Sequence, residues 1–357
     1  ELRPKVDVLV VISELGLARN IALAKETSGV DFIFSSGMHE ETTEATRLSN
    51  GTVLMAEGAN GVHVGELNIL VKDHKLMGHR FKMHTIDINI PVNRKTQSLI
   101  EEVRAPFVQK HGAKELINPF SNRHLRGPID EIIAQAEVDL HRSDFSESMM
   151  PAVIEGSSHD FLADAFREQS GADIGLISGF RYGTNIKKGS IRREDIYHYI
   201  PTGPFIAKGE MSGRKIKNII EDSADGSLSH SSRSWKGTWL AAWSGLHFSL
   251  NPHASKGERA SEITVLDKKS QTYLPLGMDK VYTVASYHYD DEPGLINKLK
   301  AENIKRVLND KGEAIDAIEV VEEYLKEHKA DPELKRIKLL DPLPSSKYGI
   351  KEIQPLP

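Results

Sequence analysis

The stretch "VDVLVVISELGLARNIALAKETSGVDFIFSSGMHEET", residues 6–42, decides the fold class. Residues 6–13 are rich in β-branched apolar side chains, the pattern of a strand that is covered on both faces. Residues 15–29 follow with a helical apolar stripe and end at Gly29, a typical residue after a helix C-terminus. Residues 30–36 are a second apolar run. Strand, helix and strand in this order predict a βαβ unit with two parallel strands.

Two polar residues follow the strands of this unit. Glu14 comes directly after the first strand, and His39 comes shortly after the second. Parallel strands end at the same edge of a sheet, and in open α/β sheets this edge is where ligands bind. Two interpretations remain open from the residues alone: a metal site, or two polar residues at strand ends.

The next part of the chain changes pattern. Apolar and polar residues alternate over residues 67–84, with a turn at 72–75, which predicts an antiparallel hairpin and hence a mixed sheet. Residues 96–150 read as mainly helical, and we interpret them as the connection between two domains.

Two helices are expected in this connection. The first covers residues 96–111 and should kink or end at Pro106. The second covers residues 127–144 and has Pro128 at its start. The sequence Asp139-Leu140-His141 falls inside this second pattern, and we interpret it as an exposed helix face.

A second α/β unit is predicted after the connection. Its expected helices are residues 155–171, 212–226 and 313–328, with Gly171 as the C-cap of the first and Ser212 as the N-cap of the second. Its expected strands are residues 172–178, 244–252, 261–267 and 280–289.

Composition narrows the function classes. The chain has 357 residues and a net charge of −5, which gives no reason to expect nucleic acid as a partner. It has no cysteine, so a metal would be held by His, Asp, Glu, Asn or water. No run of about 18 or more apolar residues occurs, so no membrane span is expected.

The βαβ stretch resembles the second half of a calcineurin-like metallophosphoesterase domain of the 5′-nucleotidase family. In that family the first strand ends in Ser/Thr-His-x-Gly, and the next ends in Gly-His-x-His followed by an acid. Here the corresponding residues read Ser13-Glu14-Leu15-Gly16 and Gly37-Met38-His39-Glu40. Glu14 thus stands in place of one histidine, Gly37 in place of another, and His39 is retained.

The second half of the chain extends the resemblance. "SSHDFLADAFREQSGADIGLISGFRYG", residues 157–183, is similar to the start of the family's C-terminal domain, and residues 187–201 and 210–226 continue the similarity. Residues 179–184, 220–225 and 243–252 are closest to the thiosulfohydrolase branch of the sulfur-oxidation system.

The resemblance implies an α/β fold in two parts. Residues 1–95 would form the C-terminal half of a metallophosphoesterase αββα sandwich, and residues 96–150 the helical linker. Residues 151–357 would form a separate α/β C-terminal domain that selects the substrate.

The resemblance also implies a metal-dependent hydrolase of a phosphate ester such as a nucleotide. Such enzymes use two divalent ions, here Mn, Zn or Mg, about 3.5–4 Å apart. Glu14 and His39 would be metal ligands. A thiosulfohydrolase-like enzyme is an alternative, and so is a non-catalytic binding protein whose metal site has decayed.

Substrate binding would involve three residues of the second half. Arg181 lies in the glycine-flanked loop "SGFRYG" after an expected strand, where a guanidinium can fork onto an oxyanion. Tyr287 and Asp290 lie where nucleotidases carry an aromatic residue and a Gly-Asp-Gly segment for base and ribose. The Gly-Asp-Gly segment itself is absent here.

The family's earlier metal motifs, Asp-x-His, Gly-Asp and Gly-Asn-His-Glu, do not precede the βαβ stretch in this sequence, and its one Asp-x-His is Asp139-Leu140-His141. The resemblance therefore implies an N-terminal segment that carries them, on the same precursor or as a separate chain. It also implies a periplasmic or exported protein.

Overall fold

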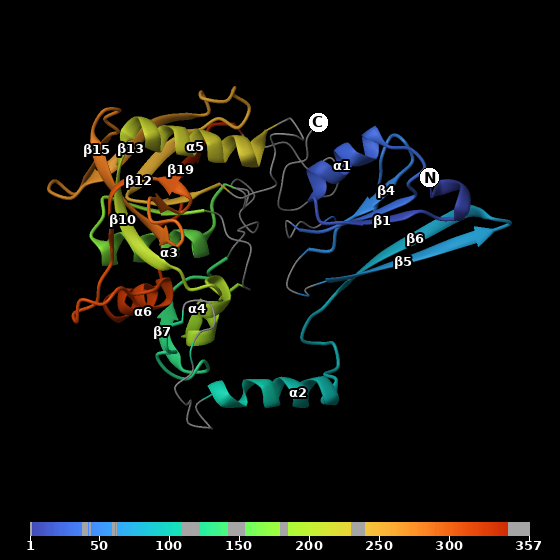
Figure 1. Cartoon of the computed structure of the whole chain (residues 1–357), viewed down its shortest axis with the longest axis horizontal. Helices are drawn as coiled ribbons and strands as arrows, with labels where there is room; N and C mark the ends of the chain where they lie inside the picture. Colours follow the sequence, from blue (N-terminus) through green and yellow to red (C-terminus); the bar gives the residue numbers. More distant parts are fainter. Residues whose placement is uncertain are drawn as a thin grey trace.

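The computed structural model describes residues 2–37, 42, 44–58, 61, 63–108, 117, 122–141, 154–178, 185–229 and 240–341. Figure 1 shows two groups of strands and helices, joined by the helix α2 (Arg94–Arg104). The two-part α/β architecture predicted from the sequence is confirmed.

The predicted βαβ unit is present. After a short 3-10 helix (Arg3–Lys5), β1 (Val10–Ser13) and β2 (Phe32–Ser35) pair in parallel, with Val10 opposite Phe32. The helix α1 (Leu17–Glu26) connects them and ends three residues before Gly29, because Thr27 donates its backbone N–H to Ala24 O and its hydroxyl to Leu23 O.

This sheet has four strands in the order β1-β2-β4-β3. The strand β4 (Val53–Met55) runs parallel to β2, and β3 (Thr46–Arg47) runs antiparallel to β4 at the far edge. One face packs on α1. The other face packs on the hairpin described next.

The hairpin consists of β5 (His63–Lys72) and β6 (Lys75–Thr85), as predicted. Its turn residues Asp73 and His74 have φ of 49° and 60°, the left-handed conformation that tight hairpin turns require. The hairpin is a two-stranded sheet of its own, so its expected place in the mixed sheet was wrong. It forms a second layer because its inward apolar side chains pack on Phe32, Val53 and Met55.

The first predicted linker helix is α2, with Asn93 as its N-cap, and Pro106 lies in the 3-10 turn (Ala105–Phe107) that ends it. The second predicted helix is wrong. Residues Ile132–Ala136 form the strand β7, which pairs with β9 (Gly189–Arg192), because cross-strand pairing outweighs the helical spacing of its apolar residues.

The correction extends to Asp139-Leu140-His141, which is not on a helix: Leu140 forms a β-bridge with Ile186. The predicted domain boundaries at residues 95 and 150 stay a prediction. The strand β7, which lies between them, is joined by hydrogen bonds to β9 in the part that follows.

The C-terminal body, residues 122–341 where described, contains two main sheets. The first has the strand order β11-β8-β15-β10-β18 and the second β14-β13-β12-β19. The strands of the first are β11 (Ala242–Ser244), β8 (Ile174–Ile177), β15 (Val281–His288), β10 (Phe205–Ser212) and β18 (Glu302–Arg306). Those of the second are β14 (Thr272–Pro275), β13 (Ala260–Asp267), β12 (Leu246–Leu250) and β19 (Ile337–Leu339).

Helices cover both faces of the first sheet. The helices α3 (Ser157–Ser170), α4 (Arg193–Tyr199) and α6 (Ala317–Glu327) bury one core, and α5 (Gly213–Leu228) with the second sheet buries the other. A small hairpin, β16 (Leu295–Ile296) and β17 (Leu299–Lys300), follows β15. The predicted N-cap Ser212 of α5 and the predicted C-cap Gly171 of α3 are both confirmed.

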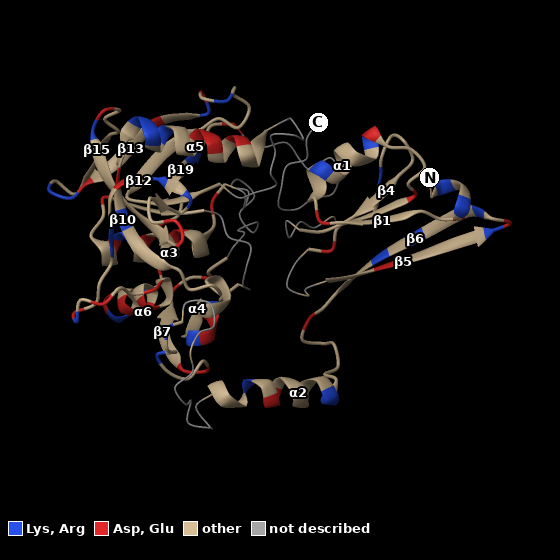
Figure 2. Ribbon diagram, in the orientation of Figure 1, with Lys and Arg blue, Asp and Glu red and all other residues tan. Residues whose placement is uncertain are grey.

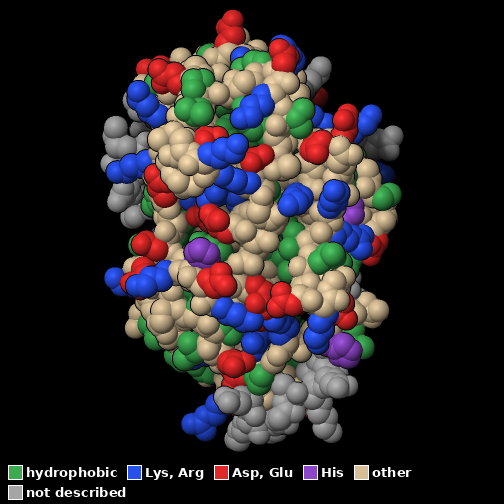
Figure 3. Space-filling model, turned by 90° about the vertical axis from the view of Figure 1, so that its left-hand side faces the viewer, with side chains coloured by type: hydrophobic (Ala, Val, Ile, Leu, Met, Phe, Trp, Pro, Cys, Tyr) green, Lys and Arg blue, Asp and Glu red, His purple; other side chains and the backbone are tan. Residues whose placement is uncertain are grey.

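Charged residues of both signs are interspersed along the ribbon of both parts (Figure 2). The side of the molecule shown in Figure 3 likewise carries mixed charges with apolar side chains between them. The described residues on that side form no large patch of one sign, in keeping with the small net charge of −5. Within the described residues, no helix is both long and apolar enough to cross a membrane.

Candidate functional site

The carboxyl ends of β1 and β2 lie side by side. The backbone N–H of Ser36 donates to Ser13 O at 2.8 Å, and the N–H of Gly16 donates to Ser36 O at 3.1 Å. Glu14 is exposed at this edge, as the sequence predicts for a parallel pair. His39 lies outside the described residues, so its pairing with Glu14 stays a prediction.

Gly37 is required by the backbone at this edge. Its φ is +100°, a conformation that L side chains rarely adopt. A Cβ on residue 37 would lie 2.5 Å from Glu14 O and 3.1 Å from Glu14 Cγ. A histidine side chain therefore does not fit at residue 37 with this backbone.

A third strand brings an acid to the same edge. β4 runs parallel to β2 with Met55 opposite Phe34, so Glu57 follows its carboxyl end. The Oε1 atom of Glu57 is buried and has no hydrogen-bond partner among the described residues, and burial raises the pKa of this carboxyl group. Glu57 was not predicted as a site residue, because residues 53–55 were not expected to form a strand.

Two carboxylates fit a hard divalent cation in chemistry, and the buried Glu57 Oε1 is an oxygen without a partner among the described residues. They do not make a complete site: no group of three or more His, Asp or Glu within the described ranges is placed to hold a metal. Further ligands would come from residues 38–41 or from another segment.

The second candidate edge lies in the C-terminal body, where β8 and β15 run parallel. Ser178 follows β8 there, and Arg181 lies outside the described residues. Tyr287 packs edge to face on Phe166, with ring centroids 5.3 Å apart, and burial raises the pKa of Tyr287. Its ring therefore belongs to the core beneath this edge.

Asp290 follows β15 and is exposed. Its carboxylate pairs with Arg306, whose guanidinium lies 4.4 Å from the centroid of the Phe205 ring. Tyr287 and Asp290 thus lie at the end of the same strand. The ring of Tyr287 packs on Phe166, and the carboxylate of Asp290 pairs with Arg306.

The turn of the β16–β17 hairpin also reaches this edge. Asn297 and Lys298 have φ of 49° and 61°, and the Asn297 side-chain amide donates to Ser178 Oγ at 2.8 Å. The backbone N–H of Asn297 donates to Tyr287 O at 2.6 Å. The signal in the sequence is Asn297-Lys298 between Leu295-Ile296 and Leu299, a short tight-turn pattern.

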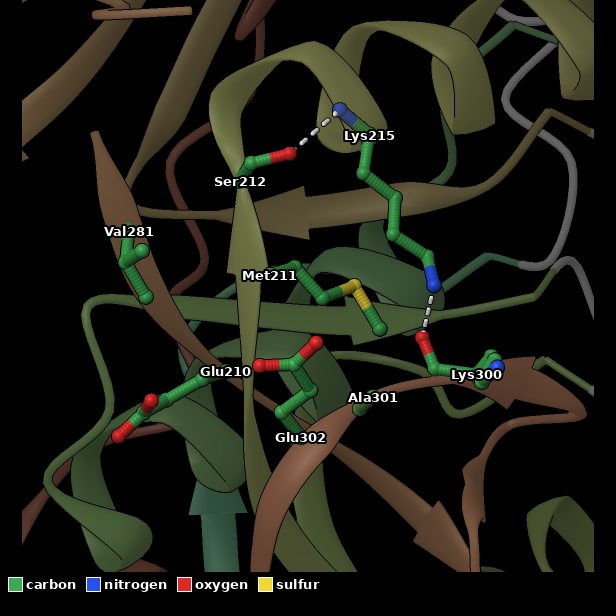
Figure 4. A pocket seen from close by; sticks show the side chains of 8 residues that line it. All are labelled: Glu210, Met211, Ser212, Lys215, Val281, Lys300, Ala301 and Glu302. Atoms are coloured by element: carbon green, nitrogen blue, oxygen red, sulfur yellow. Dashed lines mark hydrogen bonds between the residues drawn. The ribbon is translucent and has the colours of Figure 1, made fainter. Parts of the chain in front are cut away.

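A further pocket has a volume of about 380 Å³. Lys215, Lys300, Glu210 and Glu302 are among the residues that line it (Figure 4). The ammonium group of Lys215 donates to the backbone oxygen of Lys300. The first N–H groups of α5 are all occupied: they donate to Lys280 O, Met278 O and Ser212 Oγ. The pocket therefore offers an anion no free helix N-terminus, and its charges balance within it.

Comparisons with known proteins agree with this architecture. Residues 132–294 match the family described as 5′-nucleotidase, C-terminal domain. The trifunctional nucleotide phosphoesterase protein YfkN of Bacillus subtilis is 19% identical over 291 residues, which cover 80% of this chain and 18% of the relative. The NAD 5′-nucleotidase of Haemophilus influenzae is 20% identical over 327 residues, which cover 80% of this chain and 53% of the relative. The chain thus spans about half or less of these curated relatives.

Two solved structures share the fold. The sulfate thiohydrolase SoxB of Thermus thermophilus superimposes with a TM-score of 0.72 and 20% identity, covering 98% of this chain and 56% of that one. A 5′-nucleotidase precursor, also of Thermus thermophilus, gives a TM-score of 0.71 and 19% identity, covering 95% of this chain and 65% of that one. The resemblance stated from the sequence is confirmed.

Proposed function

Taking residues 132–294 as a 5′-nucleotidase C-terminal domain, we propose that this chain is part of a metal-dependent hydrolase that cleaves a small phosphate ester, such as a nucleotide. The observation that carries the proposal is this family match, on a chain whose preceding sheet ends in acidic residues at one carboxyl edge.

The proposed roles divide between the two parts. Glu14, with His39, would hold divalent ions, which polarise the phosphoryl oxygens and lower the pKa of a bound water. Arg181 would bind the oxyanion of the substrate, and Tyr287 and Asp290 would line its other end. Mn, Zn and Mg all suit His and carboxylate ligands.

A further polypeptide segment would complete the sheet, either on the same precursor or as a separate chain. β1 is an edge strand of its sheet. Val10 and Ile12 lie opposite Phe32 and Phe34 on the face that the hairpin covers, yet Ile12 is 84% exposed. An apolar edge of this kind favours pairing with another strand. We also propose export to the periplasm, in keeping with the similarity to a nucleotidase that is made as a precursor.

A thiosulfohydrolase-like activity is the alternative substrate class, supported by a fold similarity as high as that to the nucleotidase. A non-catalytic binding protein is the other alternative. The backbone at Gly37, which leaves no room for an imidazole, favours this second alternative over a complete ancestral site.

The test uses the complete gene product, purified and stripped of metal with EDTA. We expect release of phosphate from a 5′-nucleotide only after Mn²⁺, Zn²⁺ or Mg²⁺ is restored. Release of sulfate from a protein-bound thiosulfonate, with no release of phosphate, would replace the substrate class by the alternative.

Glu14→Gln should lower this activity, because it removes a proposed metal ligand. Glu66→Gln is the matched control. Glu66 is an exposed hairpin residue paired with His84, and its variant should leave the activity unchanged. Absence of bound metal and of either activity in the wild-type protein would refute the enzyme and leave the binding protein.

A further inference from the structure

Three carboxyl groups and one guanidinium are buried together where β19 meets α3. Asp160 and Asp164 belong to α3. Glu155 lies just before that helix, and Arg336 lies just before β19. Asp160 is 1% exposed, and Glu155 and Arg336 are buried as well. With three carboxylates against one guanidinium, full ionisation would leave a net charge of −2 in the interior, which costs free energy.

The guanidinium of Arg336 is committed to other acceptors. It donates to Asp164 Oδ2 at 2.7 Å, and to the backbone oxygens of Trp243 and Glu333, both at 2.9 Å. Its Nη1 atom lies 3.9 Å from Asp160 Oδ1, beyond hydrogen-bonding distance. Arg336 therefore neutralises Asp164, whereas Asp160 has no hydrogen bond from this cation.

Glu155 binds the backbone just before β19. Its two carboxyl oxygens accept from the N–H groups of Lys335 and Arg336, both at 2.9 Å. Lys335 has a φ of 70°, the left-handed conformation that is uncommon for a residue with a side chain. Successive N–H groups in such a turn form a concave site for an anion. Glu155 is therefore the ionised carboxyl group that holds this turn.

Asp160 is the carboxyl group that holds a proton. As a carboxylate, it would leave its Oδ2 atom buried with no donor among the described residues. As a carboxylic acid, it donates to the carboxylate of Glu155, to which it is hydrogen-bonded. Burial raises the pKa of both groups, and that of Asp160 further, because the two N–H groups at Glu155 favour its ionised form. The pair thus shares one proton, which Asp160 carries.

The charged groups that act most strongly on Asp160 are Arg336, Glu155 and Asp164. Burial lowers the pKa of His247, so that this imidazole stays neutral at neutral pH and above. Further titratable groups border the cluster from α3, α6, β12, β14 and the segment before β19: His159, Arg167, Glu168, Tyr324, His328, His247, Tyr273, Glu333 and Lys335.

Loss of the shared proton weakens the contact with β19. Two carboxylates would then face each other in the interior, and the hydrogen bond between them would be lost. β19 is a three-residue strand at the edge of its sheet. Two backbone hydrogen bonds flank it: Phe248 N–H donates to Arg336 O at 3.1 Å, and Leu340 N–H donates to Leu250 O at 2.9 Å. Release of this short edge strand is the change that lets water reach the two carboxylates.

We propose that Asp160 and Glu155 form a pH-sensitive latch, in which one shared proton fastens the turn at residues 335–336, and with it β19, to the start of α3. The latch holds while the proton is present and loosens as rising pH removes it. This inference is independent of the proposed function, because it involves neither a metal nor a substrate.

The direction of the pH dependence follows from the shared proton. When β19 detaches, water reaches the pair and Asp160 releases its proton near the ordinary pKa of an aspartate, about 4. The attached state therefore binds one more proton above this pH. Attachment of β19 should weaken up to about tenfold per pH unit, until the attached pair is itself ionised.

The test is hydrogen exchange of the complete gene product from about pH 5 to about pH 8, corrected for the intrinsic rate and followed in peptides that cover β19. In the wild-type protein, protection of β19 should fall up to about tenfold per pH unit. Asp160→Asn keeps a group that donates to Glu155 but removes the proton that titrates. In this variant, protection should be independent of pH and should exceed that of the wild type at pH 8.

Asp222→Asn is the matched control. Asp222 of α5 is exposed and pairs with Lys256 on the surface, so this variant should keep the wild-type pH profile of β19. The bordering histidines are intact in both variants, so their titration would give Asp160→Asn the same profile as the wild type. Such a result would overturn the latch.

Infrared spectroscopy detects the proton directly, because a neutral carboxyl group and a carboxylate absorb at different frequencies. The wild-type protein at pH 7 should show the C=O stretch of a neutral carboxyl group that Asp160→Asn lacks. If Asp160→Asn does not fold, as shown by circular dichroism, the wild-type protein decides the question alone. A wild-type spectrum with no neutral carboxyl group at pH 7, or protection of β19 that does not fall with rising pH, would overturn the proposal.

Discussion

The C-terminal body buries both faces of its central sheet, whereas the N-terminal sheet leaves an edge strand open to solvent. In the body, helices lie on one face and a helix with a second sheet on the other. In the N-terminal part, α1 and the hairpin cover β2 and β4, and Ile12 of β1 remains 84% exposed. Buried apolar area is the main favourable term in folding. The larger share of the buried apolar area, and with it of the stability, therefore lies in the body.

The largest expected effect concerns Arg336, which joins β19 to α3. Its guanidinium donates to Asp164 Oδ2 at 2.7 Å, and its backbone N–H donates to Glu155 Oε1 at 2.9 Å. Burial raises the pKa of Asp160, the third carboxyl group of this cluster, well above its ordinary value. Arg336→Met should lower the free energy of unfolding of the body by about 3–5 kcal/mol, because buried carboxylates lose their cation.

Arg3→Met is the matched change in the N-terminal part. Arg3 pairs with Asp31, but its side chain is 40% exposed, so we expect a loss of at most about 1 kcal/mol. Trp243 is buried in the core of the body, so its fluorescence during urea unfolding reports on the body. Hydrogen exchange of peptides from β2 reports on the N-terminal sheet. Equal losses in the two variants would contradict the comparison.

The next effect compares two isoleucines. Ile216 of α5 is fully buried, and Ile216→Ala should cost about 2–5 kcal/mol in the unfolding of the body. In the chain of residues 1–357, Ile12→Ala should leave the stability of the N-terminal sheet almost unchanged. Hydrogen exchange in β1 and β2 measures this stability. In the complete gene product, Ile12→Ala should slow or weaken folding of the N-terminal sheet if another segment covers β1. A large cost in residues 1–357 alone would mean that β1 is already covered.

Much of this architecture could be predicted from the sequence because apolar periodicity and capping residues agreed. The βαβ unit, α3 with Gly171 and α5 with Ser212 are examples. The segment 127–144 was predicted wrongly, since its apolar residues fit a helix as well as a strand and only the distant β9 decides between them. The layer of the hairpin was also missed, because packing between layers leaves no local signal.

The candidate site was predictable only where it depends on topology. Glu14 lies at the predicted edge because parallel strands end together. The role of Gly37 depends on a φ of +100° and a close approach to Glu14, and neither is visible in the order of residues. Glu57 was missed because the strand before it has only three residues. A short apolar run followed by an acid, inside a parallel sheet, is the signal that could have found it.

The smallest expected effect compares two helix caps. Ser212 Oγ accepts from Lys215 N–H at the start of α5, and Asn93 Oδ1 accepts from Thr96 N–H at the start of α2. Ser212→Ala should cost about 1 kcal/mol in urea unfolding followed by tryptophan fluorescence, because α5 packs into the body. Asn93→Ala removes an equivalent hydrogen bond, but α2 buries no residue, so only local hydrogen exchange in α2 should rise. A measurable effect of Asn93→Ala on the body would mean that α2 is coupled to it, and the connection would then transmit stability between the two parts.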